Sequence, residues 1–264
     1  MPRSRSESAA PAEENDRDYV SSFARGLDVI RAFTRTRRSM TLSEVAERTG
    51  MNRAATRRFL LTLVREGYAE SDGKNFQLLP KILDLGFSAL ASLGLTTVAQ
   101  PILNDLSDVI QESCFVVILD GDSCVYVARS QSRRVMVVSI DIGSRAPAWV
   151  MSSGRVLLSA LSEDALEDYL KRVKLEALTP QAVTSKIKLK ALIEEAGQQG
   201  YCVVDQEYEI GLRSISVPIR DRGGTIVAAL NVACPSPRFT IDDMRTRVLP
   251  KLLESAGAIT RFLS

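Results

Sequence analysis

Residues 41–67 read TLSEVAERTGMNRAATRRFLLTLVREG, and this stretch decides the fold of the first part of the chain. Thr41 followed three residues later by Glu44 is a capping-box pattern, which predicts the start of a helix. Two helices joined by a tight turn need a small side chain where they cross and a turn residue that tolerates positive φ. Ala46 and Gly50 meet these two needs, so the stretch predicts a helix-turn-helix.

A second helix is expected from its N-cap at Asn52 to Glu66. Its first turns carry asparagine and arginine, whose donors and acceptors match adenine and guanine edges in the major groove of DNA. The first residues of such a recognition helix reach furthest into the groove, while basic residues around it contact phosphates. The side chains expected to contact DNA are Arg25, Thr41, Asn52, Arg53, Thr56, Arg57, Arg58 and Lys74.

A β-hairpin is expected after the second helix, because Ser71-Asp72-Gly73-Lys74 contains Asp-Gly, a strong hairpin signal. Such a hairpin forms the wing of a winged helix-turn-helix. An earlier helix over 21–34 is expected to bury Phe23 and other apolar residues at helical spacing. Pro80 then opens an apolar helix, expected over 81–93, which we interpret as a connector and a candidate subunit contact.

Positive charge is concentrated in this first part of the chain. Residues 17–81 carry 13 Lys and Arg against 7 Asp and Glu, whereas residues 82–264 carry 19 against 21. A basic first part followed by a nearly neutral second part predicts that the first part binds a polyanion, and double-stranded operator DNA fits that description. The same excess argues against the alternative of a module that uses its wing to bind protein.

The chain contains no histidine, which removes the commonest general base and the usual zinc ligand. We therefore expect no enzyme and no cofactor. The four cysteines form no C-x-x-C pair and are interpreted as small buried apolar residues. No apolar run is long enough to cross a bilayer and no signal-peptide pattern is present, so we expect a cytoplasmic protein without a membrane partner.

The second part of the chain mixes hairpins with helices. Hairpins are expected around turns at 120–123 and 220–225, and a further strand over 135–139. Hairpin connections favour a mainly antiparallel sheet flanked by helices, which makes the expected fold class α+β. The expected division is a disordered tail over 1–19, a winged helix-turn-helix over 20–79, a linker helix over 80–97 and an effector-binding domain over 98–264.

Several short motifs occur in a fixed order along the chain. They are Arg25-Gly26-Leu27, Leu42-Ser43-Glu44-Val45-Ala46, Gly67-Tyr68, Gly143-Ser144-Arg145-Ala146-Pro147, Ser153-Gly154-Arg155-Val156-Leu157-Leu158, Val204-Asp205-Gln206-Glu207 and Gly211-Leu212-Arg213-Ser214-Ile215. Their order resembles the IclR family of bacterial transcription regulators. The stretches 133–136, 147–148 and 153–158 are most similar to its PcaR/PcaU/PobR subgroup, which controls aromatic-acid catabolism.

This resemblance implies a GAF-like effector domain that responds to a small organic acid of protocatechuate or β-ketoadipate metabolism. Free N–H groups at a helix start near Ser152 suit a carboxylate. Ser214 and Ser216 share one face of a strand, because side chains alternate. The resemblance places the pocket among these segments. The residues expected to bind the effector are Arg145, Ala146, Pro147, Met151, Ser152, Ser153, Gly154, Asp205, Glu207, Ser214, Ser216, Asn231 and Ala233.

Ligand binding is expected to change the spacing of two DNA-reading units in a homodimer, with pairing of dimers left open. The direction of regulation also stays open. Trp149 stands where the resemblance implies a smaller or tyrosine-like residue, so a different short oxo-acid or acyl ligand is an alternative. A second alternative is an enzyme that uses the carboxylates of Asp205 and Glu207. Each polar residue of the expected pocket also has a simpler role open to it, as a helix or turn cap.

Overall fold

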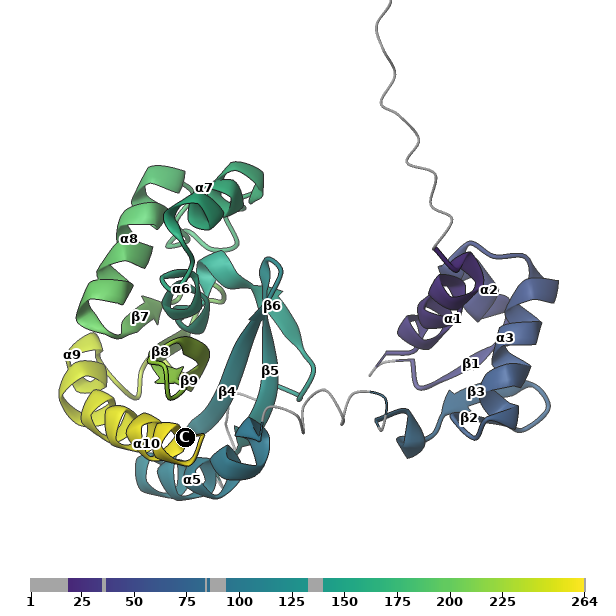
Figure 1. The fold of residues 1–264 in the computed structure, drawn as a ribbon, viewed down its shortest axis with the longest axis horizontal. Helices are drawn as coiled ribbons and strands as arrows, with labels where there is room; N and C mark the ends of the chain where they lie inside the picture. The colour runs from purple at the N-terminus through teal and green to yellow at the C-terminus, as the bar shows by residue number, and fades with distance from the viewer. Residues whose placement is uncertain (1–18, 35–36, 84, 86–93, 133–139, 264) are drawn as a thin grey trace, which may run out of the picture. The chain divides into compact units, whose positions relative to one another are not determined.

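The structure, a computed structural model, describes residues 19–34, 37–83, 85, 94–132 and 140–263. The chain divides into two compact units between residues 87 and 88, and each is described by itself (Figure 1). Most of the expected tail and of the expected connector helix lie outside the described residues, as does the expected strand over 135–139. No helix in the described part of the chain has the length and apolarity needed to cross a bilayer.

The first unit packs helices against a small antiparallel sheet. Its helices are α1 (Ser21–Ala32), α2 (Leu42–Thr49) and α3 (Arg53–Arg65). Its strands lie in the order β1 (Ser39–Thr41), β3 (Asn75–Leu78) and β2 (Ala69–Ser71), and a short 3₁₀ turn, η1 (Pro80–Leu83), follows. This arrangement confirms the predicted winged helix-turn-helix.

The predicted caps set the corner between α2 and α3. Thr41 Oγ1 accepts from Glu44 N at 3.4 Å, and Glu44 Oε2 accepts from Thr41 N at 2.7 Å, so the capping box is confirmed. Gly50 ends α2 with a φ of +66°, a left-handed conformation that costs glycine little. Asn52 Oδ1 then accepts from Ala55 N at 2.8 Å and starts α3.

Two details of the first unit differ from the prediction. Strand β1 was not expected, because it is only three residues long and follows an arginine-rich stretch. Its buried Met40 lies opposite buried Phe76, which explains why it pairs with β3. Phe23 was expected to be buried but is 69% exposed, because the buried face of α1 holds Val29 and Ala32 instead.

The second unit is built on a six-stranded sheet in which every neighbouring pair is antiparallel, as predicted. The spatial order is β6 (Arg145–Pro147), β5 (Ser123–Ser130), β4 (Ser113–Asp120), β9 (Ile226–Pro235), β8 (Leu212–Arg220) and β7 (Cys202–Asp205). The short edge strand β6 was not predicted. It pairs with β5 over three residues.

Helices cover both faces of this sheet, as Figure 1 shows. One face carries α5 (Leu95–Ile110) and α10 (Leu249–Phe262), which pack on each other. The other face carries α6 (Ser152–Leu158), α7 (Glu163–Arg172) and α8 (Lys186–Gln199), preceded by the 3₁₀ turn η2 (Ala148–Val150). Because side chains alternate along a strand, neighbours such as Val116 and Val117 enter opposite cores.

The last helical stretch is not one regular helix. It consists of a short α9 (Ile241–Asp243), a π segment (Met244–Val248) and then α10, with Pro250 in its first turn. Proline has no N–H to donate and crowds the carbonyl four residues before it. The wider π turn lies just before the proline, so the irregularity precedes Pro250 rather than starting at it.

Candidate DNA-binding surface and effector site

The exposed face of α3 carries the side chains expected to read bases. Asn52, Arg53 and Arg57 are all exposed, and Arg53 and Arg57 stand one turn apart on the same side of the helix. The position of Thr56 corrects the prediction, because this residue is fully buried, like Leu60 four residues later. The Thr56 hydroxyl donates to the Asn52 carbonyl oxygen at 3.0 Å, so it stabilises the first turn instead of facing DNA.

Of the other expected DNA contacts, Arg25, Arg58 and Lys74 are exposed, while Thr41 is half-buried and its hydroxyl serves the capping box. Lys74 lies in the turn of the wing, which Asp72 holds in shape. Asp72 Oδ1 accepts from Lys74 N at 2.8 Å and from Asn75 N at 2.7 Å. The Asn75 backbone bond, then its side chain, lower the pKa of Asp72 to about 2, so the carboxylate stays ionised at neutral pH.

A buried polar cluster lies in the second unit, between α6 and the sheet. Ser152 Oγ is 2.9 Å from Ser214 Oγ and 2.9 Å from Ser216 Oγ. Asn231 Nδ2 donates to Ser216 Oγ at 2.9 Å, and the register places Asn231 directly opposite Ser216. All four residues are at most 5% exposed. The predicted shared face of the two strands is thus confirmed, and α6 adds Ser152 to it.

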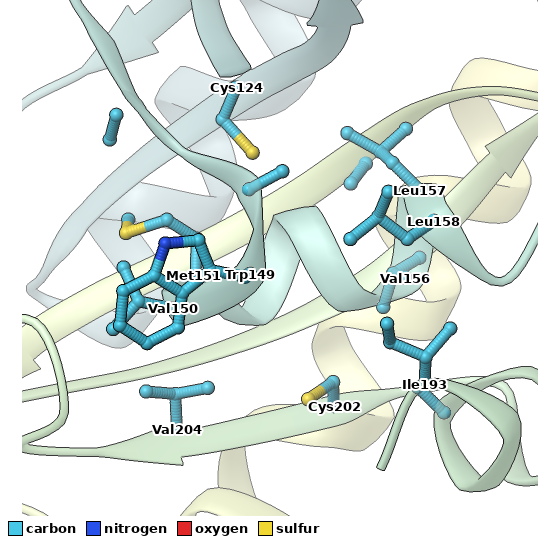
Figure 2. Close-up of a cluster of buried hydrophobic side chains, with 14 of the residues drawn as sticks. Cys124, Trp149, Val150, Met151, Val156, Leu157, Leu158, Ile193, Cys202 and Val204 are labelled. Carbon is cyan, nitrogen blue, oxygen red and sulfur yellow. The ribbon is translucent and has the colours of Figure 1, made fainter. Parts of the chain in front are cut away.

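Apolar side chains surround this cluster on the α6 side of the sheet. The core there includes Ala146, Met151 and Ala233, three residues from the expected pocket. Figure 2 shows Trp149, Val150 and Met151 grouped together, with Val204 and Cys202 on the neighbouring strand. Ser153 Oγ lies 3.7 Å from Cys124 Sγ. Polar groups set in an apolar wall are typical of small-molecule sites.

Gly154 brings α6 close to the turn before it. A Cβ built on Gly154 would lie 1.9 Å from the Ala148 carbonyl oxygen and 2.5 Å from the Ala148 carbonyl carbon. Met151 N donates to that same Ala148 oxygen at 3.3 Å. Only a residue without a side chain fits here, so Gly154 fixes the path that carries Ser152 to the sheet.

Four of the expected effector residues point away from the cluster or are held by other side chains. On β6, Ala146 points into the core, so Arg145 and Pro147 point outward by alternation. Arg145 is exposed and its Nη1 lies 2.6 Å from Asp120 Oδ2, so this geometry gives no support to its expected contact with the effector. Asp205 faces the opposite side of the sheet from Val204 and accepts from Arg213 Nε at 2.8 Å.

Glu207 is the fourth of these residues, and an arginine already occupies its carboxylate. Arg155 Nη1 donates to Glu207 Oε1 at 2.9 Å, and Arg155 Nη2 donates to Oε2 at 2.6 Å. Val183 N donates to Oε2 at 3.2 Å. The Glu207 oxygens are therefore used within the fold, and a role in binding the effector stays a prediction.

Comparison with known proteins assigns both units. The model of the IclR helix-turn-helix domain matches residues 22–73, and the model of the bacterial transcriptional regulator IclR C-terminal domain matches residues 87–261. The chain belongs to the IclR family. The Pca regulon regulatory protein of Pseudomonas putida is a 43% identical IclR relative, aligned over 94% of this chain and 87% of its own length.

Solved IclR structures show the same architecture. A transcriptional-regulator candidate from Rhodococcus sp. RHA1 is 46% identical, with a TM-score of 0.86 over 93% of this chain and 98% of its own. The inducer-binding domain of PobR from Acinetobacter, a double mutant solved with 3-hydroxybenzoic acid, is 31% identical. It has a TM-score of 0.59 over 64% of this chain and 97% of its own. The resemblance to the PcaR/PcaU/PobR subgroup is therefore confirmed.

Arg155 was not among the residues expected at the effector site of this IclR protein, although it holds the segments around the site in place. It is 1% exposed, and besides its two bonds to Glu207 its Nε donates to the Trp149 carbonyl oxygen at 3.1 Å. Arg155 therefore ties together α6, the turn that carries Trp149 and the loop after β7. All residues of α6 are buried, and the apolar run Val156-Leu157-Leu158 directly after Arg155 was a signal that this helix has no solvent-facing side.

The four cysteines of this IclR protein are free thiols, and all four are buried, as predicted. Burial raises the pKa of all four thiols, to about 11 for Cys202 and about 12 for Cys124 and Cys234. Because the thiolate is the reactive form, these residues act as small apolar side chains near neutral pH.

Proposed function

We propose that this regulator binds double-stranded operator DNA through α3 and the wing, as a homodimer in the cytoplasm, and that a small aromatic acid alters its affinity for DNA. The observation that carries the proposal is the division of α3 into two sides. Arg53 and Arg57 are exposed, whereas Thr56 and Leu60 are buried. Bidentate arginine contacts to guanine are the commonest specific readout in the major groove, and this division leaves both guanidinium groups available for it.

Two observations support an aromatic acid as the effector. The relatives regulate the Pca regulon or, in the case of PobR, hold 3-hydroxybenzoic acid in an inducer-binding domain. In this chain, the cluster of Ser152, Ser214, Ser216 and Asn231 offers hydroxyl and amide groups inside an apolar core. An aromatic ring suits the apolar wall, and the polar groups suit a carboxylate or hydroxyl substituent.

The alternative of a carboxylate-based enzyme receives no support from the site. Asp205 and Glu207 were its candidate catalytic pair, but each accepts hydrogen bonds from its own arginine, Arg213 and Arg155. They also differ in environment, since Asp205 faces the other side of the sheet. A general acid and base must reach one substrate together.

The effector part of the proposal is tested by titrating DNA from the region upstream of the protein's own gene, followed by fluorescence anisotropy. The expected result is a 5- to 150-fold change in DNA affinity, roughly the range of allosteric coupling, with 3-hydroxybenzoate or protocatechuate. Adipate-type and short oxo-acids serve as the competing ligand classes. Ser152→Ala should reduce this change, because it removes the hydroxyl that bonds Ser214 and Ser216 of β8 and accepts from Asn231 of β9.

Ser159→Ala is the matched control, since Ser159 lies at the other end of α6 and its hydroxyl donates to the Val156 carbonyl oxygen of the same helix, away from the cluster. It should leave the effector response intact. A response to oxo-acids alone would replace the aromatic ligand with the alternative class. DNA affinity that ignores every acid in the panel would contradict the sensing role.

A further inference from the structure

A hollow of about 310 Å³ lies in the first unit, between the start of α1 and one side of α3. It is separate from the surface formed by Arg53 and Arg57. Its walls combine hydroxyl groups, guanidinium groups and an aromatic ring. The lining residues are Ser21, Ser22, Arg25, Ala55, Arg58, Phe59 and Thr62.

The charge of this hollow is entirely positive, because Arg25 and Arg58 line it and no carboxylate does. Within the described residues, neither arginine forms an ion pair, although both are exposed. Another hollow, in the second unit, differs in this respect. There the lining includes Asp122, whose Oδ1 lies 2.7 Å from Arg172 Nη2. The cations of the α1–α3 hollow are therefore available to an anionic ligand.

The spacing along α3 explains why Arg58 serves this hollow rather than the exposed face with Arg57. Ala55, Arg58 and Thr62 follow one another at intervals of three and four residues, so they form a row on the side of α3 that meets α1. Arg53 and Arg57 form a second row, rotated away from the first. The helix therefore presents arginines in two directions.

The floor of the hollow is apolar, since Ala55 and the half-buried ring of Phe59 lie between the two arginines' helices. Thr62 Oγ1 donates to the Arg58 carbonyl oxygen at 2.8 Å, which leaves the hydroxyl oxygen free to accept. Two cationic side chains beside an apolar surface suit a nucleotide of the DNA backbone, which carries one negative charge on its phosphate next to a sugar ring.

We propose that Arg25 and Arg58 hold one and the same phosphodiester of the DNA backbone, with its deoxyribose against Ala55 and Phe59. This inference rests on the proposed DNA binding and deepens it. The two sets of arginines on α3 then have different roles. Arg53 and Arg57 contact bases, whereas the hollow fixes the position of α3 along the DNA backbone. A contact of this kind positions the protein without specifying sequence.

The test is a salt titration of DNA binding by the full chain, with Arg25→Gln, Arg58→Gln and the double variant. Each phosphate neutralised contributes about 0.9 to the slope of log K against log salt. A shared phosphate predicts that the double variant loses about 0.9 in slope, and that its affinity loss is smaller than the product of the two single losses. We expect that loss to be roughly 10-fold or more, equal on the upstream DNA and on a scrambled duplex.

Arg31→Gln and Arg65→Gln are the matched controls, because they remove arginines from the same two helices outside the hollow. They should keep the wild-type slope. If the double variant loses about 1.8 in slope and its affinity loss equals the product of the two single losses, the arginines bind two separate phosphates and the proposal of one shared phosphate is wrong. Unchanged slopes would overturn it altogether, while wild-type protein that binds no duplex at all would instead reject the proposed function.

Discussion

Gly154→Ala is expected to lower the free energy of unfolding of the second unit by about 3 kcal/mol or more, the upper range for overpacked cores. The added methyl group would lie 1.9 Å from the Ala148 carbonyl oxygen, and backbone cannot rotate aside as a side chain can. Either α6 or the turn before it must move, which also separates Ser152 from the strands. Urea unfolding followed by circular dichroism measures the loss.

Gly257→Ala is the control for this substitution. A Cβ at Gly257 would meet only the end of the Arg261 side chain, at 3.8 Å. Because alanine favours helices over glycine by about 1 kcal/mol, this variant should be neutral or slightly more stable. If Gly154→Ala unfolds at the same urea concentration as the wild type, the close approach of α6 to its preceding turn is wrong.

Glu207→Ala should destabilise the second unit by about 3–5 kcal/mol, the cost of leaving one charge of a buried pair without its partner. The side chain of Arg155 is 2% exposed and that of Glu207 is 11% exposed, so water cannot replace the lost carboxylate. The substitution also frees Val183 N, which donates to Glu207. The same urea titration measures the effect.

The double variant Arg155→Met with Glu207→Leu should recover part of this loss, because it removes both charges and refills the space with apolar atoms. An exposed pair provides the control. Asp168 and Lys171 are 67% and 72% exposed, so Asp168→Ala should cost less than about 1 kcal/mol. Equal losses for Glu207→Ala and Asp168→Ala would contradict the burial of the Arg155 pair.

Local patterns were enough to predict the helix-turn-helix of the first unit. The cap at Thr41, the corner at Gly50 and the cap at Asn52 each depend on residues at most four positions apart, so sequence spacing alone identifies them. The face shared by Ser214 and Ser216 was predictable for the same reason, since a strand alternates every second residue. These patterns do not determine which residues of a helix face the core. For this reason Thr56 was expected on the exposed side of α3, although it is buried.

Contacts between distant segments were not predictable in this way. Arg155 and Glu207 are 52 positions apart, and each alone resembles an ordinary polar residue at the end of a helix or in a loop. The exposed position of Arg145 was not predictable from sequence spacing either. Its outward direction follows only once 145–147 is known to be a strand whose Ala146 faces the core.

Trp149 was expected to change the shape of the pocket, and the structure shows where its side chain lies. It is 3% exposed, its ring packs in the α6-side core, and its carbonyl oxygen accepts from Arg155. Trp149 is thus part of the wall that holds α6 against the sheet.

DNA binding by α3 is the central claim, and a comparison of Arg57→Ala with Arg65→Ala tests it most directly. The quantity to measure is the ratio of affinities for the protein's own upstream DNA and for a scrambled duplex of equal length. Removing a bidentate base contact costs about 1–3 kcal/mol of discrimination, so Arg57→Ala should lower that ratio by roughly 5- to 150-fold. Arg65→Ala should preserve it. An unchanged ratio for Arg57→Ala would show that the exposed side of α3 does not read the operator.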